Sequence, residues 1–277
     1  MRQLEILKEN ENIIINNIEC LNIALSLDCG QAFRWRSTSD NAWCGVVKNK
    51  YLKIEQKENN IIFYDTTEED FNLIWKEYFD LERDYNSILN NYDEENLISA
   101  CKKYNGIRIL KQDEWEAICS FIISANNNIP RIKGIIERLC ENFGERVAQS
   151  YTFPSPEKIA ELEVSDLEII RAGFRAKYIL DAARKISTKE VDIEKIKNMS
   201  FEDAKQELLK IKGVGEKVAQ CSLLYGFGRL EAFPQDVWVK RIVSELYPGG
   251  LPECIKGTEG IAQQYLFHWR RNLDNSK

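Results

Sequence analysis

The spacing of apolar residues changes once along the chain, and that change is the strongest constraint on its fold. Up to about residue 100, short runs rich in β-branched and aromatic residues alternate with clusters of Asn, Gly, Ser and Asp, as in an antiparallel sheet. From about residue 113 the apolar residues recur at helical spacing. The expected fold class is α+β, with an N-terminal antiparallel sheet domain and flanking helices over residues 1–112 and an all-helical domain over residues 113–277.

Strands are expected in five apolar runs, and helices after residues that favour a helix N-cap. The runs are Ile13–Ile18, Ala32–Trp35, Trp43–Val47, Tyr51–Ile54 and Ile61–Tyr64. A helical stretch is expected where apolar residues recur at Phe71, Ile74, Trp75 and Tyr78. In the second part, helices are expected to begin at Asp113, Ser165, Ser200 and Asp236. The helix from Ser165 is expected to stop at Gly173, and the helical period resumes over residues 177–186.

Charge excludes one class of nucleic-acid protein. The 277 residues carry 38 Lys and Arg against 44 Asp and Glu, a net charge of −6. This balance argues against a protein that coats nucleic acid through bulk positive charge. The charge is uneven, because residues 1–100 have a net charge of −9 and residues 101–277 a net charge of +3. If a polyanion binds, the second part is favoured.

The cysteines and the single histidine limit which metal sites, disulfides and reactive side chains the protein is expected to use. Eight cysteines lie scattered without a C-x-x-C pair, which indicates free thiols rather than a zinc site or a disulfide framework. His268 is the only histidine, so the reaction is expected to use Lys, Asp, Glu, Cys or Tyr. The N-terminus is charged, and no apolar run approaches the ~18 residues of a membrane span. A cytoplasmic protein is therefore expected.

A glycine hairpin is the most informative segment. Residues 211–217 place Lys212-Gly213-Val214-Gly215 between two expected helices. The unpaired N–H groups at the start of the second helix are positively polarised, so such a hairpin can hold a phosphate without a cationic side chain. Taken alone, the same residues could equally form a plain connection between packed helices.

Three side chains that follow the hairpin in the sequence, Lys217, Cys221 and Asp236, are candidates for the chemistry. Lys217 lies in the first turn of the second helix, where the helix dipole disfavours an ammonium and favours the neutral amine that a Schiff-base nucleophile needs. Cys221 lies four residues later on the same face. Asp236 is expected to cap a further helix, where N–H groups hold its carboxylate ionised. The plain alternatives are an exposed, phosphate-contacting lysine and a purely structural cap.

Together these features resemble the helix-hairpin-helix (HhH-GPD) DNA glycosylases, and Lys217 resembles the lysine of their lyase branch. Four further motifs are similar to those of the eukaryotic-type 8-oxoguanine DNA glycosylase/AP lyase family, in a short prokaryotic-style form. The motifs are Gly30-Gln31-Ala32-Phe33-Arg34-Trp35, Ser124-Ala125-Asn126-Asn127-Asn128-Ile129-Pro130-Arg131-Ile132, Gly173-Phe174-Arg175-Ala176-Lys177-Tyr178 and Gln263-Gln264-Tyr265-Leu266-Phe267. The resemblance spans nearly the whole chain.

The resemblance implies base excision repair of 8-oxoguanine in double-stranded DNA, preferably opposite cytosine. Lys217 would attack the sugar, release the base and form a Schiff base that undergoes β-elimination, while Asp236 would stabilise the developing cation. The implied reaction requires no metal or organic cofactor. The compact length and the lack of targeting signals lead us to expect a monomer that acts at the nucleoid. Only Cys254 lies beyond Cys221, too few cysteines for the iron–sulfur cluster of related glycosylases.

The resemblance also assigns binding roles. Gly30, Cys221, Gln263 and Phe267 would bind the extruded base, with the Gly30 carbonyl accepting from N7–H, which guanine lacks. The residues that would contact DNA are Asn126, Arg131, Phe174, Arg175, Gly213, Gly215 and Trp238. Asn126 would fill the vacated space, Phe174 would wedge beside the orphaned cytosine, and both arginines would donate to that base.

Two positions depart from the commonest family pattern, and two other functions stay open. Phe174 stands where tyrosine is more familiar, and Trp238 where a histidine is often found near the catalytic aspartate. The first alternative is a non-catalytic helix-hairpin-helix DNA-binding protein. The second is a related glycosylase that removes alkylated purines.

Overall fold

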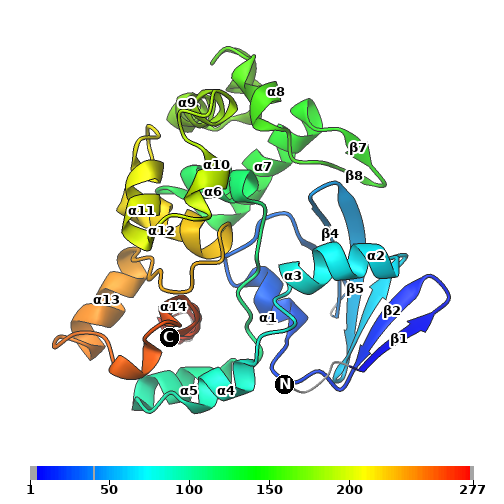
Figure 1. Ribbon diagram of the computed structural model, residues 1–277, viewed down its shortest axis with the longest axis vertical. Coiled ribbons are helices and arrows are strands. Elements are labelled where there is room, and N and C mark those ends of the chain that lie inside the picture. The colour runs from blue at the N-terminus through cyan, green and yellow to red at the C-terminus, as the bar shows by residue number, and fades with distance from the viewer. Residues whose placement is uncertain (1–4, 40, 275–277) are drawn as a thin grey trace. The chain divides into compact units, whose positions relative to one another are not determined.

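Figure 1 shows the computed structural model, which describes residues 5–39 and 41–274; part of the charged N-terminus lies outside these ranges. The chain divides into two compact units. Unit 1 comprises residues 1–44, 52–111 and 230–277, and unit 2 comprises residues 45–51 and 112–229. The C-terminal 48 residues therefore group with most of the sheet, which apolar spacing did not indicate. The two domain ranges expected from the sequence stay a prediction.

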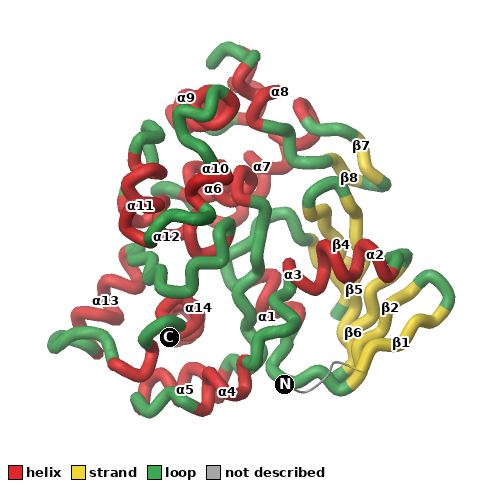
Figure 2. Tube along the Cα trace, in the orientation of Figure 1, coloured by secondary structure: helices red, strands yellow, loops and turns green. Residues whose placement is uncertain are grey.

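A six-stranded antiparallel sheet precedes the helical part, which confirms the expected fold class (Figure 2). The strands, in spatial order, are β1 (Glu5–Glu9), β2 (Asn12–Asn16), β6 (Asn60–Tyr64), β5 (Lys50–Lys57), β4 (Ala42–Val47) and β3 (Arg36–Ser39). Ile13 and Ile15 of β2 are fully buried while their neighbours are partly exposed, so one face of this strand supplies the core.

The expected strand Ala32–Trp35 is wrong, because this segment is irregular and the strand begins only at Arg36. Ala32, Phe33 and Trp35 are all buried, so the segment does not alternate between a core face and a solvent face as a half-buried strand does. Strand β1 was not expected from the sequence, and its five residues are exposed.

Unit 1 contains helices that cover the sheet and a separate group near the C-terminus. The helices are α1 (Ile23–Asp28), α2 (Glu68–Asp70), α3 (Lys76–Tyr78), α4 (Tyr85–Asn90), α5 (Glu95–Lys103), α13 (Val237–Leu246) and α14 (Glu259–Asp274). A π-helical turn, Phe71–Trp75, joins α2 to α3 across the expected helical stretch. Phe63 of β6 makes edge contacts with the rings of Phe71 and Phe79, and α14 packs against α5 and α13.

Unit 2 is mainly helical and holds the glycine hairpin. Its helices are α6 (Glu114–Ser124), α7 (Ile129–Phe143), α8 (Pro156–Ala160), α9 (Ala176–Ser187), α10 (Ile193–Ile196), α11 (Phe201–Leu209) and α12 (Glu216–Tyr225). A short hairpin pairs β7 (Arg146–Val147) with β8 (Ser150–Tyr151). No helix in the described ranges is long and apolar enough to cross a membrane.

Three of the four expected N-caps are confirmed. The side chains of Asp113, Ser200 and Asp236 each accept a hydrogen bond from the backbone N–H three residues later, at 2.8–3.2 Å. The helix expected from Ser165 is wrong in type and extent: residues 166–170 form a 3-10 helix whose left-handed terminal residue is Arg171, two residues before Gly173. A second 3-10 turn, Gly173–Arg175, then leads into α9.

Candidate active site

The amine of Lys217 is held between two side chains of α6. Lys217 is the second residue of α12 and is partly buried. Its Nζ lies 3.2 Å from Oγ of Ser124 and 5.3 Å from the centroid of the Phe121 ring. A single hydroxyl and an aromatic face fix the amine without pairing it to a carboxylate in either contact. Ser124 and Phe121 were not predicted as site residues, although Ser124 opens one of the quoted motifs.

The hairpin backbone places Lys217 at the start of α12. Gly213 has a φ of +82°, a conformation that glycine adopts without strain. A Cβ built on Gly213 would lie 2.4 Å from ring atoms of Tyr178, so the hairpin packs closely against α9. Gly215 is the N-cap of α12, and a Cβ there would meet no atom within 4 Å. Residue 213 is therefore glycine because of packing and φ, whereas residue 215 presents open space at a helix N-terminus.

Three consecutive asparagines form the turn between α6 and α7, and each has a distinct local position. Asn126 is exposed and has a left-handed φ of +49°. Asn127 donates from Nδ2 to the Ile123 carbonyl at 3.0 Å, near the end of α6. Asn128 caps α7 by accepting from the backbone N–H of Arg131 at 3.0 Å. The caps hold the turn at both ends and leave the Asn126 side chain exposed at its tip.

Arg175 joins this turn to the turn before α9. It is only 3% exposed, and its guanidinium donates to the carbonyls of Ala125, at 2.6 and 3.0 Å, and Asn126, at 2.8 Å. Burial and the nearby charge of Arg131 lower the pKa of the Arg175 guanidinium. Arg175 was expected to donate to cytosine. In this structure its N–H groups donate to backbone carbonyls of the asparagine turn. Arg131 itself is exposed.

Phe174 is exposed at the tip of the turn, as its expected role as a wedge requires. Its side chain is 55% exposed, and its ring meets the Tyr178 ring edge-on at 5.9 Å between centroids. The guanidinium carbon of Arg175 lies 4.4 Å from the Phe174 ring centroid. The ring therefore packs against Tyr178 of α9 and against Arg175, the residue that bonds to the asparagine turn.

In unit 1, buried glutamines hold the Gly30 loop against α14. Gln31 donates from Nε2 to the carbonyls of Ser26 and Arg108 at 2.8 and 2.7 Å, and its Oε1 accepts from the Leu110 N–H at 3.0 Å. Gln264 donates to the Cys29 carbonyl at 3.1 Å. Gly30, between these anchored residues, has a φ of +90°. The glycine carbonyl is thus part of a rigid loop next to α14, the helix that carries Gln263 and Phe267.

Gln263 is hydrogen-bonded to the segment that leads into Asp236. Gln263 is 6% exposed and donates from Nε2 to the Pro234 carbonyl at 3.2 Å, two residues before Asp236. Its Oε1 is buried and has no hydrogen-bond partner within the described ranges. Asp236 is partly exposed and is fixed by its cap bond to Val239 N–H at 2.8 Å. Trp238, in the first turn of α13, lies 5.6 Å from the guanidinium carbon of Arg241.

The expected site residues thus fall into two sets, one in each unit. Unit 1 holds Gly30, Asp236, Trp238, Gln263 and Phe267, and unit 2 holds Asn126, Arg131, Phe174, Arg175, Gly213, Gly215, Lys217 and Cys221. Cys221 is buried one turn after Lys217 on α12. Within residues 5–39 and 41–274, no group of three or more His, Cys, Asp or Glu side chains is arranged to hold a metal ion.

The contrast between the two hairpin glycines predicts a difference in stability. Gly213→Ala should lower the free energy of unfolding by about 2–4 kcal/mol, because it combines a left-handed φ with a clash against Tyr178. Gly215→Ala should cost less than about 1 kcal/mol, since its Cβ meets open space. Urea unfolding of the two variants measures this difference, and equal losses would contradict the packing described for Gly213.

Two family models match consecutive parts of the chain. Residues 13–118 match the model of the 8-oxoguanine DNA glycosylase N-terminal domain, and residues 119–251 match that of the HhH-GPD superfamily of base excision DNA repair proteins. A probable N-glycosylase/DNA lyase of Methanothermobacter thermautotrophicus is 34% identical over 195 residues, which are 62% of this chain and 62% of that protein. The N-glycosylase/DNA lyase of Saccharomyces cerevisiae is 31% identical over 265 residues, 85% of this chain and 70% of the yeast protein.

A solved structure extends the match to the full fold. The Clostridium acetobutylicum 8-oxoguanine glycosylase/lyase, in complex with double-stranded DNA containing cytosine opposite 8-oxoguanine, superposes with a TM-score of 0.91 at 34% identity. The superposition covers 97% of this chain and 98% of the clostridial chain. The chain belongs to the 8-oxoguanine DNA glycosylase family of the HhH-GPD superfamily.

Proposed function

We propose that this protein is a bifunctional DNA glycosylase/AP lyase that excises 8-oxoguanine from duplex DNA and nicks the strand. The observation that carries the proposal is the environment of Lys217, a partly buried amine at a helix N-terminus directly after the glycine hairpin. Relatives named N-glycosylase/DNA lyase and 8-oxoguanine glycosylase/lyase support it. In this proposal the enzyme acts as a monomer on chromosomal DNA in the cytoplasm, and each step uses side chains of the chain itself.

Lys217 is the proposed nucleophile. Nζ lies near the start of α12, where Ser124 and Phe121 hold it in place through contacts that involve no carboxylate. The amine lone pair forms a bond to C1′ of the sugar, and the bond from C1′ to the base breaks with its electrons going to the departing base. The attached nitrogen loses a proton to the departing base, and its lone pair then forms a C=N bond as the C1′–O4′ bond breaks and O4′ takes up a proton. The resulting Schiff base acidifies the proton on C2′. Loss of that proton expels the 3′ phosphate and nicks the strand.

Asp236 is the proposed electrostatic partner of this reaction. Its carboxylate is fixed by the N–H of Val239 at the start of α13 and remains partly exposed. A fixed anion stabilises the positive charge that develops on the sugar as the base departs, and it needs no reorganisation during that step.

The unit 1 loop and α14 are the proposed reader of the extruded base. The buried Oε1 of Gln263, without a partner in the described ranges, is an acceptor for a base N–H. The carbonyl of Gly30 would accept from N7–H of 8-oxoguanine, whereas guanine offers an acceptor at N7 and would leave two acceptors facing each other. Phe267 and Cys221 are the proposed stacking partners of the base.

Asn126, Phe174 and the two arginines are the proposed contacts at the vacated position. Asn126 lies exposed at the tip of its turn, and Phe174 is exposed beside it in the network that Arg175 completes. Filling the gap offsets part of the cost of flipping a nucleotide, which is a few kcal/mol. Arg131 is exposed and is the more accessible donor for cytosine, while Arg175 would have to exchange a backbone carbonyl for the base.

Lys217→Gln tests the nucleophile. The variant should bind lesion DNA within about threefold of wild type, because the glutamine keeps a polar group near Ser124, yet its single-turnover rate of base release should fall at least about 10³-fold. Lys195→Gln is the matched control, since that lysine is 72% exposed and lies outside the site. Base release by Lys217→Gln at a near wild-type rate would refute the assignment; loss in both variants would point to unfolding.

Duplexes that differ in one base test substrate and partner recognition. Wild-type protein should release 8-oxoguanine faster opposite cytosine than opposite adenine, guanine or thymine, and Arg131→Ala should reduce that preference about tenfold, in line with the ~1–3 kcal/mol of a good base contact. Single-turnover rates on four 8-oxoguanine duplexes and one 3-methyladenine duplex make the measurement. Equal rates opposite all four bases would contradict the reading of cytosine, and faster release of the alkylated base would favour the alkylpurine alternative.

A further inference from the structure

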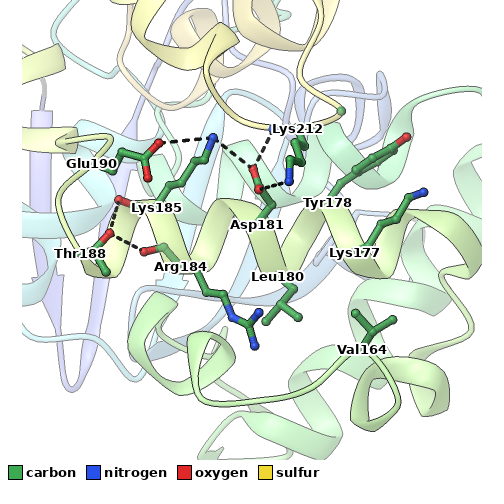
Figure 3. Close-up of a pocket in the computed structure, with 11 residues that line it drawn as sticks. Val164, Lys177, Tyr178, Leu180, Asp181, Arg184, Lys185, Thr188, Glu190 and Lys212 are labelled. Atoms are coloured by element: carbon green, nitrogen blue, oxygen red, sulfur yellow. Dashed lines mark hydrogen bonds and ion pairs between the residues drawn. The ribbon is translucent and has the colours of Figure 1, made fainter.

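One face of α9 holds the glycine hairpin in place. Tyr178, Asp181 and Lys185 follow one another at i, i+3 and i+7, so their side chains share that face. They line a groove of about 790 Å³ that also includes Lys212 and Gly213 (Figure 3). All of these residues belong to unit 2. None of the three α9 residues was predicted as part of the site.

Asp181 contacts the hairpin through the hairpin backbone. Its Oδ2 accepts a hydrogen bond from the Lys212 N–H at 2.8 Å, and its Oδ1 lies 3.6 Å from the Lys212 ammonium. The Asp181 side chain is only 15% exposed. Figure 3 shows its carboxylate between the side chains of Lys185 and Lys212. The bond to the backbone N–H fixes the first hairpin residue, whereas the two ammonium contacts fix the carboxylate.

Lys185 and Tyr178 complete the support. The Lys185 ammonium donates to the Lys210 carbonyl at 2.5 Å and lies 3.6 Å from Asp181, so it joins the end of α11 to the same carboxylate. The Tyr178 ring packs against Gly213 so closely that a Cβ on residue 213 would be 2.4 Å away. The segment from Lys210 to Gly213 is therefore held at several points by one helix.

We propose that Asp181 is a positioning residue that holds the hairpin in its DNA-binding conformation. This inference rests on the proposed function, in which the hairpin N–H groups bind a DNA phosphate. Those N–H groups bind well only if the backbone already has the required conformation, because ordering it on binding costs about 1–2 kcal/mol per residue. Without Asp181, the Lys212 N–H loses its partner, and the hairpin must be ordered by DNA itself.

Electrostatics alone predicts that removing Asp181 strengthens DNA binding, whereas the positioning role predicts that it weakens DNA binding. The two explanations can therefore be separated by experiment. Lys177, Arg184, Lys185 and Lys212 surround the groove, and Asp181 and Glu190 are its two acidic members. Removal of either carboxylate makes the groove more positive and should strengthen binding of a phosphate polymer. Glu190 contacts the Lys185 ammonium, at 3.4 Å, rather than the hairpin backbone, so it is the matched control for charge.

The experiment compares D181A, D181N and E190A by fluorescence anisotropy on an undamaged duplex and on one containing 8-oxoguanine. D181A should weaken binding of both duplexes at least about fivefold. D181N should bind as tightly as wild type or more tightly, because its amide oxygen still accepts from the Lys212 N–H. E190A should also bind both duplexes as tightly as wild type or more tightly. At saturating protein, D181A should release 8-oxoguanine within about twofold of the wild-type rate, because bound DNA orders the hairpin. The substitution should therefore lower the affinity for DNA and not the rate of base release.

Two results would overturn the positioning role. One is tighter binding by D181A, matching E190A; the other is equal weakening by D181A and D181N, which would assign the effect to charge. Alanine favours a helix interior, so D181A should keep its fold, which thermal unfolding checks. Without any variant, hydrogen exchange of wild-type protein should show a protected Lys212 amide, and rapid exchange there would also refute the proposal. Wild type that binds no DNA would instead refute the proposed function.

Discussion

The close packing of the glycine hairpin on α9 is the constraint on which the site in unit 2 depends. Gly213 lies against the Tyr178 ring with a left-handed φ, and the hairpin then turns into Gly215, the N-cap of α12. The start of α12 in turn fixes Lys217, the second residue of that helix, against Ser124 of α6. A change in the hairpin backbone would therefore move both the N–H groups that we propose bind a phosphate and the amine that we propose as the nucleophile.

Contacts within unit 2 also link Asn126 and Phe174, the two exposed side chains that contact DNA in the proposed function. Arg175 donates to the carbonyls of Ala125 and Asn126 and lies against the Phe174 ring, so the asparagine turn and the phenylalanine turn form one network. Phe174 also contacts Tyr178, the residue that packs on Gly213. Phe174, Asn126 and the hairpin are thus joined through contacts within unit 2.

Features of the fold and the site could be predicted from the sequence where they depend on residues that lie close together in the chain. The caps at Asp113, Ser200 and Asp236 were predictable because each serine or aspartate bonds a backbone N–H three residues away. The segment 32–35 was not predictable, because its burial comes with long-range contacts such as the hydrogen bond that Trp35 Nε1 donates to the Tyr78 hydroxyl. The sequence motifs indicated Lys217, but the support from Asp181 joins residues 31 positions apart and has no local signature.

The central claim is that the amine of Lys217 forms the covalent bond to DNA. The most direct measurement is borohydride reduction of the protein during turnover on an 8-oxoguanine duplex, followed by protease digestion and tandem mass spectrometry of the DNA-linked peptide. We expect one major adduct, carried by Lys217 on the peptide that begins α12. An adduct on another lysine, such as Lys212 in the hairpin, or base release without any trapped adduct, would contradict it.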